Sequence, residues 1–260
     1  MKKNTKIIVT VAVVLVGGLM LLASDNQSNQ GTTTTNKTES TSSEKTDNSS
    51  DVNESDVKQI KKELQTSIDK EKVTEFSLAE FDDYNRDQQG YYINVSNSTK
   101  NALSYVRVSF HFINADGMEV KSATADLFNL SQNNNIAAST LVDKEDLPDV
   151  KKVTATIDEV QLRSDVNVKD EENVQLGVKD NKVVLTNNRT NAIEDVRYQE
   201  IIELNGQKIA LSYDYYFGSS YGNIGAGITK VVDENEKGYP IVGVVFAPPY
   251  GNQSAIREVE

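Results

Sequence analysis

A duplication limits the possible folds of this chain more than any other feature of its sequence. Residues 95–108 align without a gap with residues 185–198. A repeat with a period of about 90 residues predicts two tandem copies of one domain. The identical pairs are Asn97/Asn187, Asn101/Asn191, Ala102/Ala192, Val106/Val196 and Arg107/Arg197.

Each copy has the pattern of short β-strands joined by turns. In the first copy, apolar residues alternate with polar ones over 106–112, which is typical of a half-buried strand. The hairpin signal Asp116-Gly117 follows, and Asn205-Gly206 occupies the matching place in the second copy. Regular short strands of this kind predict an all-β fold of two β-sandwich domains, over 73–163 and 170–256.

The repeated asparagines have a structural interpretation. Asparagine tolerates positive φ and hydrogen-bonds to nearby backbone, so each repeated pair is expected to shape a turn between strands. Their presence in both copies favours this role over ligand binding.

The strand, the Asn-rich turn, the second strand and the Asp-Gly hairpin together resemble the FxLYD-domain family of exported bacterial proteins. In place of Phe-x-Leu-Tyr-Asp the first copy reads Phe110-His111-Phe112-Ile113-Asn114, and the second copy departs further over 200–206. The resemblance implies immunoglobulin-like β-sandwiches, often held near a membrane. It implies almost nothing about activity.

The N-terminus carries an export signal. Lys2, Lys3 and Lys6 precede an uncharged, largely apolar run over 7–23, so this end should stay in the cytoplasm. Residues 1–23 are therefore expected to be a retained membrane helix or a cleaved signal peptide. Ser24 stands where a lipoprotein would carry its lipidated cysteine. We expect a single-pass membrane protein with its C-terminal part outside the cytoplasm, or a secreted protein after cleavage.

Two segments connect this N-terminus to the repeats. Residues 24–54 form a polar linker, and because 25–51 contain no hydrophobic residue we expect it to be disordered. A short amphipathic helix is predicted over 55–72, with Ser55 as its N-cap. Its apolar stripe is expected to dock against the next domain, or else to form a dimeric stalk. The stripe residues are Val57, Ile60, Leu64 and Ile68.

Composition excludes several classes of function. The net charge of −12 disfavours nucleic acid and anionic lipid as partners. The absence of cysteine excludes disulfides, thiolate nucleophiles and Cys-based zinc sites. His111, the only histidine, is expected on the outward face of its strand with no catalytic task. The acidic segments 143–146 and 233–236 occupy matching places and are expected to be solvated loops.

Few residues suggest a binding site. Asp83, Asn85 and Asp87 resemble the opening of a calcium loop, although the glycine and the closing glutamate are missing, so the match is weak. We expect no cofactor. In the Tyr- and Gly-rich stretch 213–227 and beyond it, tyrosines could contact a partner. The candidates for binding are Tyr216, Tyr221 and Tyr239.

The exposure of the Glu200 carboxylate depends on the register of its strand. Glu200 falls in the inward register of its strand, but the repeat alignment slips by one residue before Asn205. A β-bulge there would turn Glu200 outward, so we expect it to be exposed.

These observations favour a non-catalytic, membrane-anchored extracytoplasmic protein that presents tandem β-sandwich domains for binding or scaffolding at the cell envelope. Its expected partner is an envelope protein or wall polymer. The alternatives are a carboxylate-dependent enzyme acting on cell-wall polymers, which needs two acids about 5–10 Å apart, and a structural stalk or assembly subunit.

Overall fold

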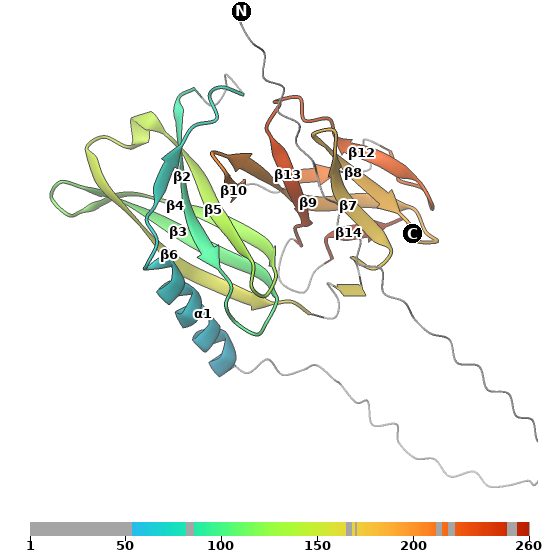
Figure 1. The fold of residues 1–260 in the computed structure, drawn as a ribbon, viewed down its shortest axis with the longest axis horizontal. Helices are drawn as coiled ribbons and strands as arrows, with labels where there is room; N and C mark the ends of the chain where they lie inside the picture. Colours follow the sequence, from blue (N-terminus) through green and yellow to red (C-terminus); the bar gives the residue numbers. More distant parts are fainter. Residues whose placement is uncertain are drawn as a thin grey trace, which may run out of the picture. The chain divides into compact units, whose positions relative to one another are not determined.

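The computed structural model describes residues 54–81, 86–164, 168–169, 171–211, 215–217 (backbone only), 222–248 and 254–259 (Figure 1). The predicted membrane segment 1–23, and the linker up to residue 53, lie outside these ranges. Within the described ranges, no helix is long and apolar enough to cross a membrane. Residues from Ser50 to Glu260 belong to one compact unit.

The described part of the fold is mostly β, as predicted, with several antiparallel sheets and the α-helix α1. The helix α1 spans Glu54–Ile68, so it begins one residue before the predicted cap and ends four residues before the predicted end. Ser55 therefore lies within the helix and is not its N-cap. The elements of the first half are β1 (Thr74–Phe76), β2 (Gln88–Ser96), β3 (Leu103–Asn114), β4 (Glu119–Leu130), β5 (Asn135–Asp143), the 3₁₀ turn η2 (Lys144–Asp146) and β6 (Val150–Leu162).

The second half repeats the strand pairing of the first. The elements of the second half are β7 (Val174–Lys179), β8 (Lys182–Asn187), β9 (Ile193–Leu204), β10 (Gln207–Ala210), β11 (Tyr215–Phe217), β12 (Thr229–Asp233), β13 (Ile241–Phe246) and β14 (Ile256–Glu258). In the first half, β1, β2 and β5 are neighbours in one sheet, and β3 lies between β4 and β6 in another. In the second half, β7, β8 and β12 are neighbours in the same order, and β9 takes the central place of β3, between β10 and β13. The sequence duplication is thus also a duplication of topology.

The predicted hairpin turns are present. Gly117 and Gly206 each have a φ of 78°, and Asn205 has a φ of 53°. Asp180 and Asn181, between β7 and β8, both have positive φ. These backbone conformations suit glycine, asparagine and aspartate, which explains why those residues stand at the turns.

The repeated asparagines shape their turns through side chains rather than through backbone conformation. Asn97 is 1 % exposed, and its Nδ2 donates to the carbonyl of Asn101 at 2.9 Å. Asn187 is fully buried and donates to the carbonyl of Asn191 at 2.8 Å. Neither is among the described residues with positive φ. The structural role is confirmed, but its mechanism is a buried amide that bridges two segments of backbone.

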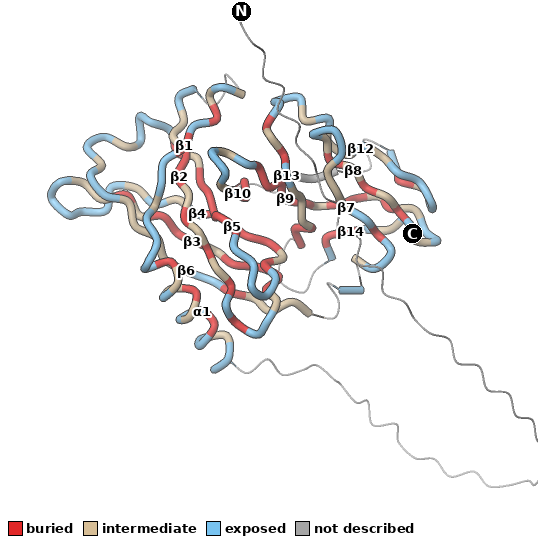
Figure 2. Tube along the Cα trace, in the orientation of Figure 1, coloured by how far each residue is buried: buried red, intermediate tan, exposed pale blue. Residues whose placement is uncertain are grey.

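The helix docks on the first half, which confirms the favoured prediction for the apolar stripe. Ile60, Leu64 and Ile68 are at most 4 % exposed and belong to the same core cluster as the inward residues of β3. Figure 2 shows the buried side of α1 turned toward the strands, with the tip of the β3–β4 hairpin exposed. The inward residues of β3 in this core are Val106, Val108, Phe110 and Phe112.

The two halves are joined by a continuous sheet. Strand β10 pairs in parallel with β5, with Ile209 opposite Ala137 and Ala210 opposite Ala138. Gln199 is only 1 % exposed. Its Nε2 donates to the Asp126 carbonyl of β4 at 2.6 Å, and its Oε1 accepts the backbone amide of Phe128 on the same strand. The halves therefore share backbone and side-chain hydrogen bonds, and the second core also contains Phe76, Leu78 and Ala137 of the first half.

Candidate functional site

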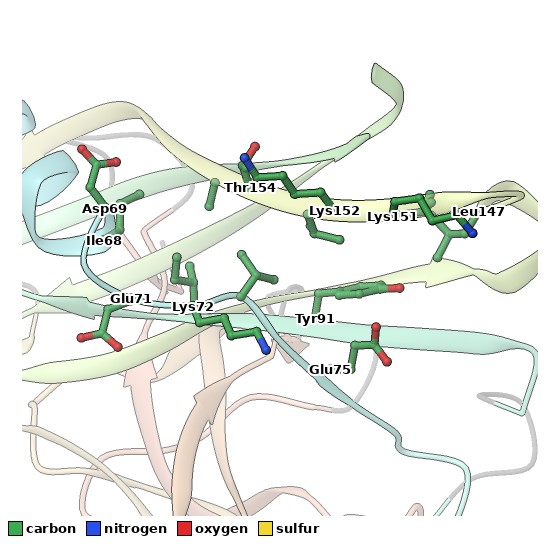
Figure 3. Close-up of a pocket in the computed structure, with 15 residues that line it drawn as sticks. Ile68, Asp69, Glu71, Lys72, Glu75, Tyr91, Leu147, Lys151, Lys152 and Thr154 are labelled. Atoms are coloured by element: carbon green, nitrogen blue, oxygen red, sulfur yellow. The ribbon is translucent and has the colours of Figure 1, made fainter. Parts of the chain in front are cut away.

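A groove opens in the first half, beyond the C-terminal end of α1. The two sheets of this half leave a lateral opening, which α1 covers along part of its length. Past Ile68 the chain turns away from β6, and a cavity of about 680 Å³ remains between the segment 68–75, β2 and the first half of β6. Figure 3 shows Lys151, Lys152 and Thr154 on one side of this hollow and Glu71, Lys72 and Glu75 on the other.

The floor of the groove is part of the hydrophobic core. Tyr91 and Ile93 of β2 are 5 % and 3 % exposed. The Tyr91 ring meets the Phe112 ring edge-on, with 5.0 Å between their centroids. Burial raises the pKa of the Tyr91 hydroxyl, and the negative charge of Glu75 raises it further. The groove therefore offers an apolar, shape-defined floor held by rigid strands.

The rim of the groove is charged on both sides. On β6, Lys151 and Lys152 are exposed, and no described acidic group forms an ion pair with either. Across the hollow, Glu71, Lys72 and Glu75 line the segment that leads into β1. In a chain of net charge −12, the β6 rim is thus locally basic.

The outer edge of β6 is open next to the groove. Among the described strands, β6 pairs only with β3. Gln65 of α1 covers part of this outer edge, farther along β6. Its Oε1 accepts the Ile157 amide at 2.7 Å, and its Nε2 lies 3.5 Å from the Ala155 carbonyl. Lys61 caps the carbonyl of Asp158 at 2.6 Å. The helix thus satisfies the edge over 155–158 and leaves the edge beside the groove without such a cap.

The corresponding opening in the second half, between β7 and β13, is smaller and is bridged by side chains. Its cavity measures about 390 Å³. Asn129 donates to the carbonyl of Phe246 at 2.8 Å, and Arg163 forms an ion pair with Glu171 at 2.6 Å. The first opening is therefore the better candidate for a ligand.

The histidine lies on the outward face of β3, as predicted, but within a hydrogen-bonded row. Its Nδ1 lies 2.9 Å from Glu119 Oε2, and its Nε2 lies 3.0 Å from Thr156 Oγ1. The Thr156 hydroxyl in turn donates to Asp158, which also accepts from Ser109. The row ties β3 to its neighbouring strands.

Of the three predicted binding tyrosines, only the side chain of Tyr239 is described, and it does not line the groove. Tyr239 is 1 % exposed in the second core, with its ring edge-on to Phe81 at 5.9 Å. This burial favours a core role. The backbone of Tyr216 pairs with Arg197, but its side chain lies outside the described residues, as does all of Tyr221.

The weak calcium candidate is only partly described. Asp83 and Asn85 lie outside the described residues. Asp87 is exposed, and its carbonyl accepts the Lys144 amide at 2.8 Å. Within the described ranges no cluster of three or more metal-ligating side chains is present.

The prediction that Glu200 is exposed was wrong, because the side chain is 1 % exposed. The bulge lies in β13, between Ile241 and Gly243, while β9 pairs with β10 without a slip. Glu200 therefore keeps the inward register. It does not line the groove.

The acidic segments lie at the surface. Lys121 pairs with Asp146 at 2.8 Å, and Lys182 pairs with Glu234 at 2.5 Å. Each loop is thus held by a lysine of its own half, although the two lysines lie on β4 and β8, which are not equivalent strands.

Comparisons with known proteins add no assignment. No protein-family model matches the chain, and no curated protein sequence matches it.

Proposed function

We propose that this chain is a membrane-anchored extracytoplasmic protein that binds a partner at the cell envelope without catalysing a reaction. In this proposal its two halves are tandem immunoglobulin-like β-sandwiches of the FxLYD type, and residues 1–23 hold it in the membrane. The repeated strand pairing and the buried asparagine turns support the tandem arrangement.

One observation carries the binding role: a groove with an apolar floor and a charged rim lies directly beside an open strand edge. The groove has a core tyrosine in its floor and exposed lysines on its rim. The volume of this hollow, about 680 Å³, lies in the range typical of binding pockets, and charged side chains surround its apolar floor. The surrounding strands are fixed by long ladders, so the site is largely pre-formed.

The location is tested with single cysteines, which are unique labels because the chain has none. A membrane-impermeant maleimide applied to cells stripped of their wall should label Lys100→Cys, an exposed position. The matched Lys2→Cys variant should react only after lysis. Protection of Lys100→Cys before lysis would contradict an extracytoplasmic location.

The binding role is tested by crosslinking from the groove. A benzophenone attached at Lys152→Cys in the full-length protein should give a crosslinked species of defined size in its own envelope. The control is Lys208→Cys, an exposed position on β10. No adduct at Lys152→Cys, or the same adducts at both positions, would count against the groove as a binding site.

A further inference from the structure

We infer that the groove takes an extended segment of a partner protein, with alternating apolar and acidic residues, which pairs as an added strand with the free edge of β6. This inference rests on the proposed function and specifies the partner. Addition of a strand to an open sheet edge is a general mode of peptide recognition.

The side chain of Gln65 shows what this edge requires. Its carboxamide offers an acceptor to the Ile157 amide and a donor to the Ala155 carbonyl. The C=O and N–H of one residue in an incoming strand point to the same side and offer the same pair of atoms. The helix thus covers one pairing position with a mimic of a strand.

The next pairing position lies at the groove. In an antiparallel ladder the backbone groups of alternate residues point to the same side. Ile157 and Ala155 point away from β3, so Val153 does too, while Thr154 pairs opposite His111. Val153 also lines the groove. A strand bonded to Val153 would therefore direct every second side chain toward Tyr91.

The lysines on the β6 side of the rim favour acidic side chains at the outward positions of the added strand, while Glu71 and Glu75 lie across the hollow. Lys152 and Thr154 lie opposite Ile113 and His111, and hence on the outer face of the extended sheet. Acidic residues at the outward positions of the added strand would meet Lys152, and those near the groove mouth would meet Lys151. The expected partner segment alternates apolar residues, directed inward, with acidic ones.

The first test uses full-length protein and a short, capped, fluorescent peptide of alternating valine and glutamate. Fluorescence anisotropy should show saturable binding, and a peptide of the same composition in two blocks should bind more weakly. Replacing Lys151→Glu and Lys152→Glu together should weaken binding about tenfold, and should favour a valine–lysine peptide instead. Equal binding of both peptides to both proteins would overturn the inference.

The second test addresses the backbone. Val153→Pro removes the outward amide while the ladder bonds of β3 come from the neighbouring residues, and proline is tolerated at sheet edges. It should reduce peptide binding at least about tenfold. In the unchanged protein, hydrogen exchange should slow at Val153 and Ala155 when the valine–glutamate peptide is added. Protection elsewhere without protection here would overturn the inference, whether or not Val153→Pro folds.

Two further outcomes separate the inference from the proposed function. If the full chain forms a dimer and Val153→Pro abolishes it, the occupant of the groove is a second copy of this chain. That result would overturn the inference that a different protein supplies the strand. A crosslink at Lys152→Cys without peptide binding would overturn the added strand alone. Absence of that crosslink would count against the proposed function itself.

Discussion

The buried asparagine of the first half should contribute more to stability than any other polar side chain of the turn. Asn97→Ala removes the donor to the carbonyls of Asn101 at 2.9 Å and Leu130 at 3.1 Å, and the acceptor of the Thr99 amide at 3.1 Å. At about 1 kcal/mol for each bond, with buried groups left unsatisfied, the free energy of unfolding should fall by about 3 kcal/mol. For a domain of this size, that lowers Tm by about 6–12 °C.

The assay is urea unfolding of residues 50–260, followed by circular dichroism. Asn187→Ala should cost a similar amount, because it loses equivalent bonds to Asn191, Ile224 and Arg189. The matched control is Asn101→Ala, since Asn101 is exposed and contributes only backbone groups to this network. A loss below about 1 kcal/mol for Asn97→Ala, or an equal loss for Asn101→Ala, would refute the assignment of the turn to a buried amide.

Three other predictions use the same fragment. Gly90→Ala would place a Cβ 2.5 Å from the Phe76 ring and should lower the free energy of unfolding by about 1–3 kcal/mol. In the control, Gly177→Ala, the new Cβ meets nothing within 4 Å, so stability should change by less than about 0.5 kcal/mol. Equal effects of the two substitutions would contradict the packing of β1 on β2. Gln199→Met should lower the free energy of unfolding by about 2–3 kcal/mol, because it leaves the Phe128 amide and the Asp126 and Leu211 carbonyls unpaired where the halves meet. An unchanged urea midpoint would show that the junction between the halves does not depend on the Gln199 side chain. The pKa of Tyr91 is raised by burial and then by Glu75, so the protonated hydroxyl stabilises the fold below pH 10 and this contribution is lost as the pH rises above 10. Tyr91→Phe should flatten that decline in stability. Glu75→Gln should lower the midpoint of the tyrosine titration seen at 295 nm.

Local patterns predicted much of the fold because the responsible forces act over short stretches of sequence. The alternation of Val106, Val108 and Phe110 reports one buried face, and the structure buries all three. The Asp116-Gly117 and Asn205-Gly206 signals depend only on local φ preferences. The stripe of α1 predicted its docking for the same reason, whereas the helix ends depend on details of capping that the pattern does not specify.

The groove was not predictable in this way. Gln65 meets Ile157 across a separation of 92 residues, and nothing in the local sequence distinguishes it from a helix glutamine that faces solvent. Glu200 was misplaced for a related reason: β9 is covered on both faces, with Ile201 in the first core and Ile202 in the second. Alternation cannot identify the outward face of a strand that has none.

The docking of α1 also has a mechanical consequence. The helix is the first described element, so a pull applied through the chain that precedes Glu54 reaches it before any strand. Its polar attachments to β6 are the contacts of Lys61 and Gln65, which are far fewer than the ladder bonds that hold β6 to β3. Its other contacts are the apolar ones of Ile60, Leu64 and Ile68, so we expect the helix to detach under load before the hydrogen-bonded strands separate. Its release would expose the Ile157 amide and the Ala155 carbonyl, and so lengthen the open edge of β6 by one pairing position.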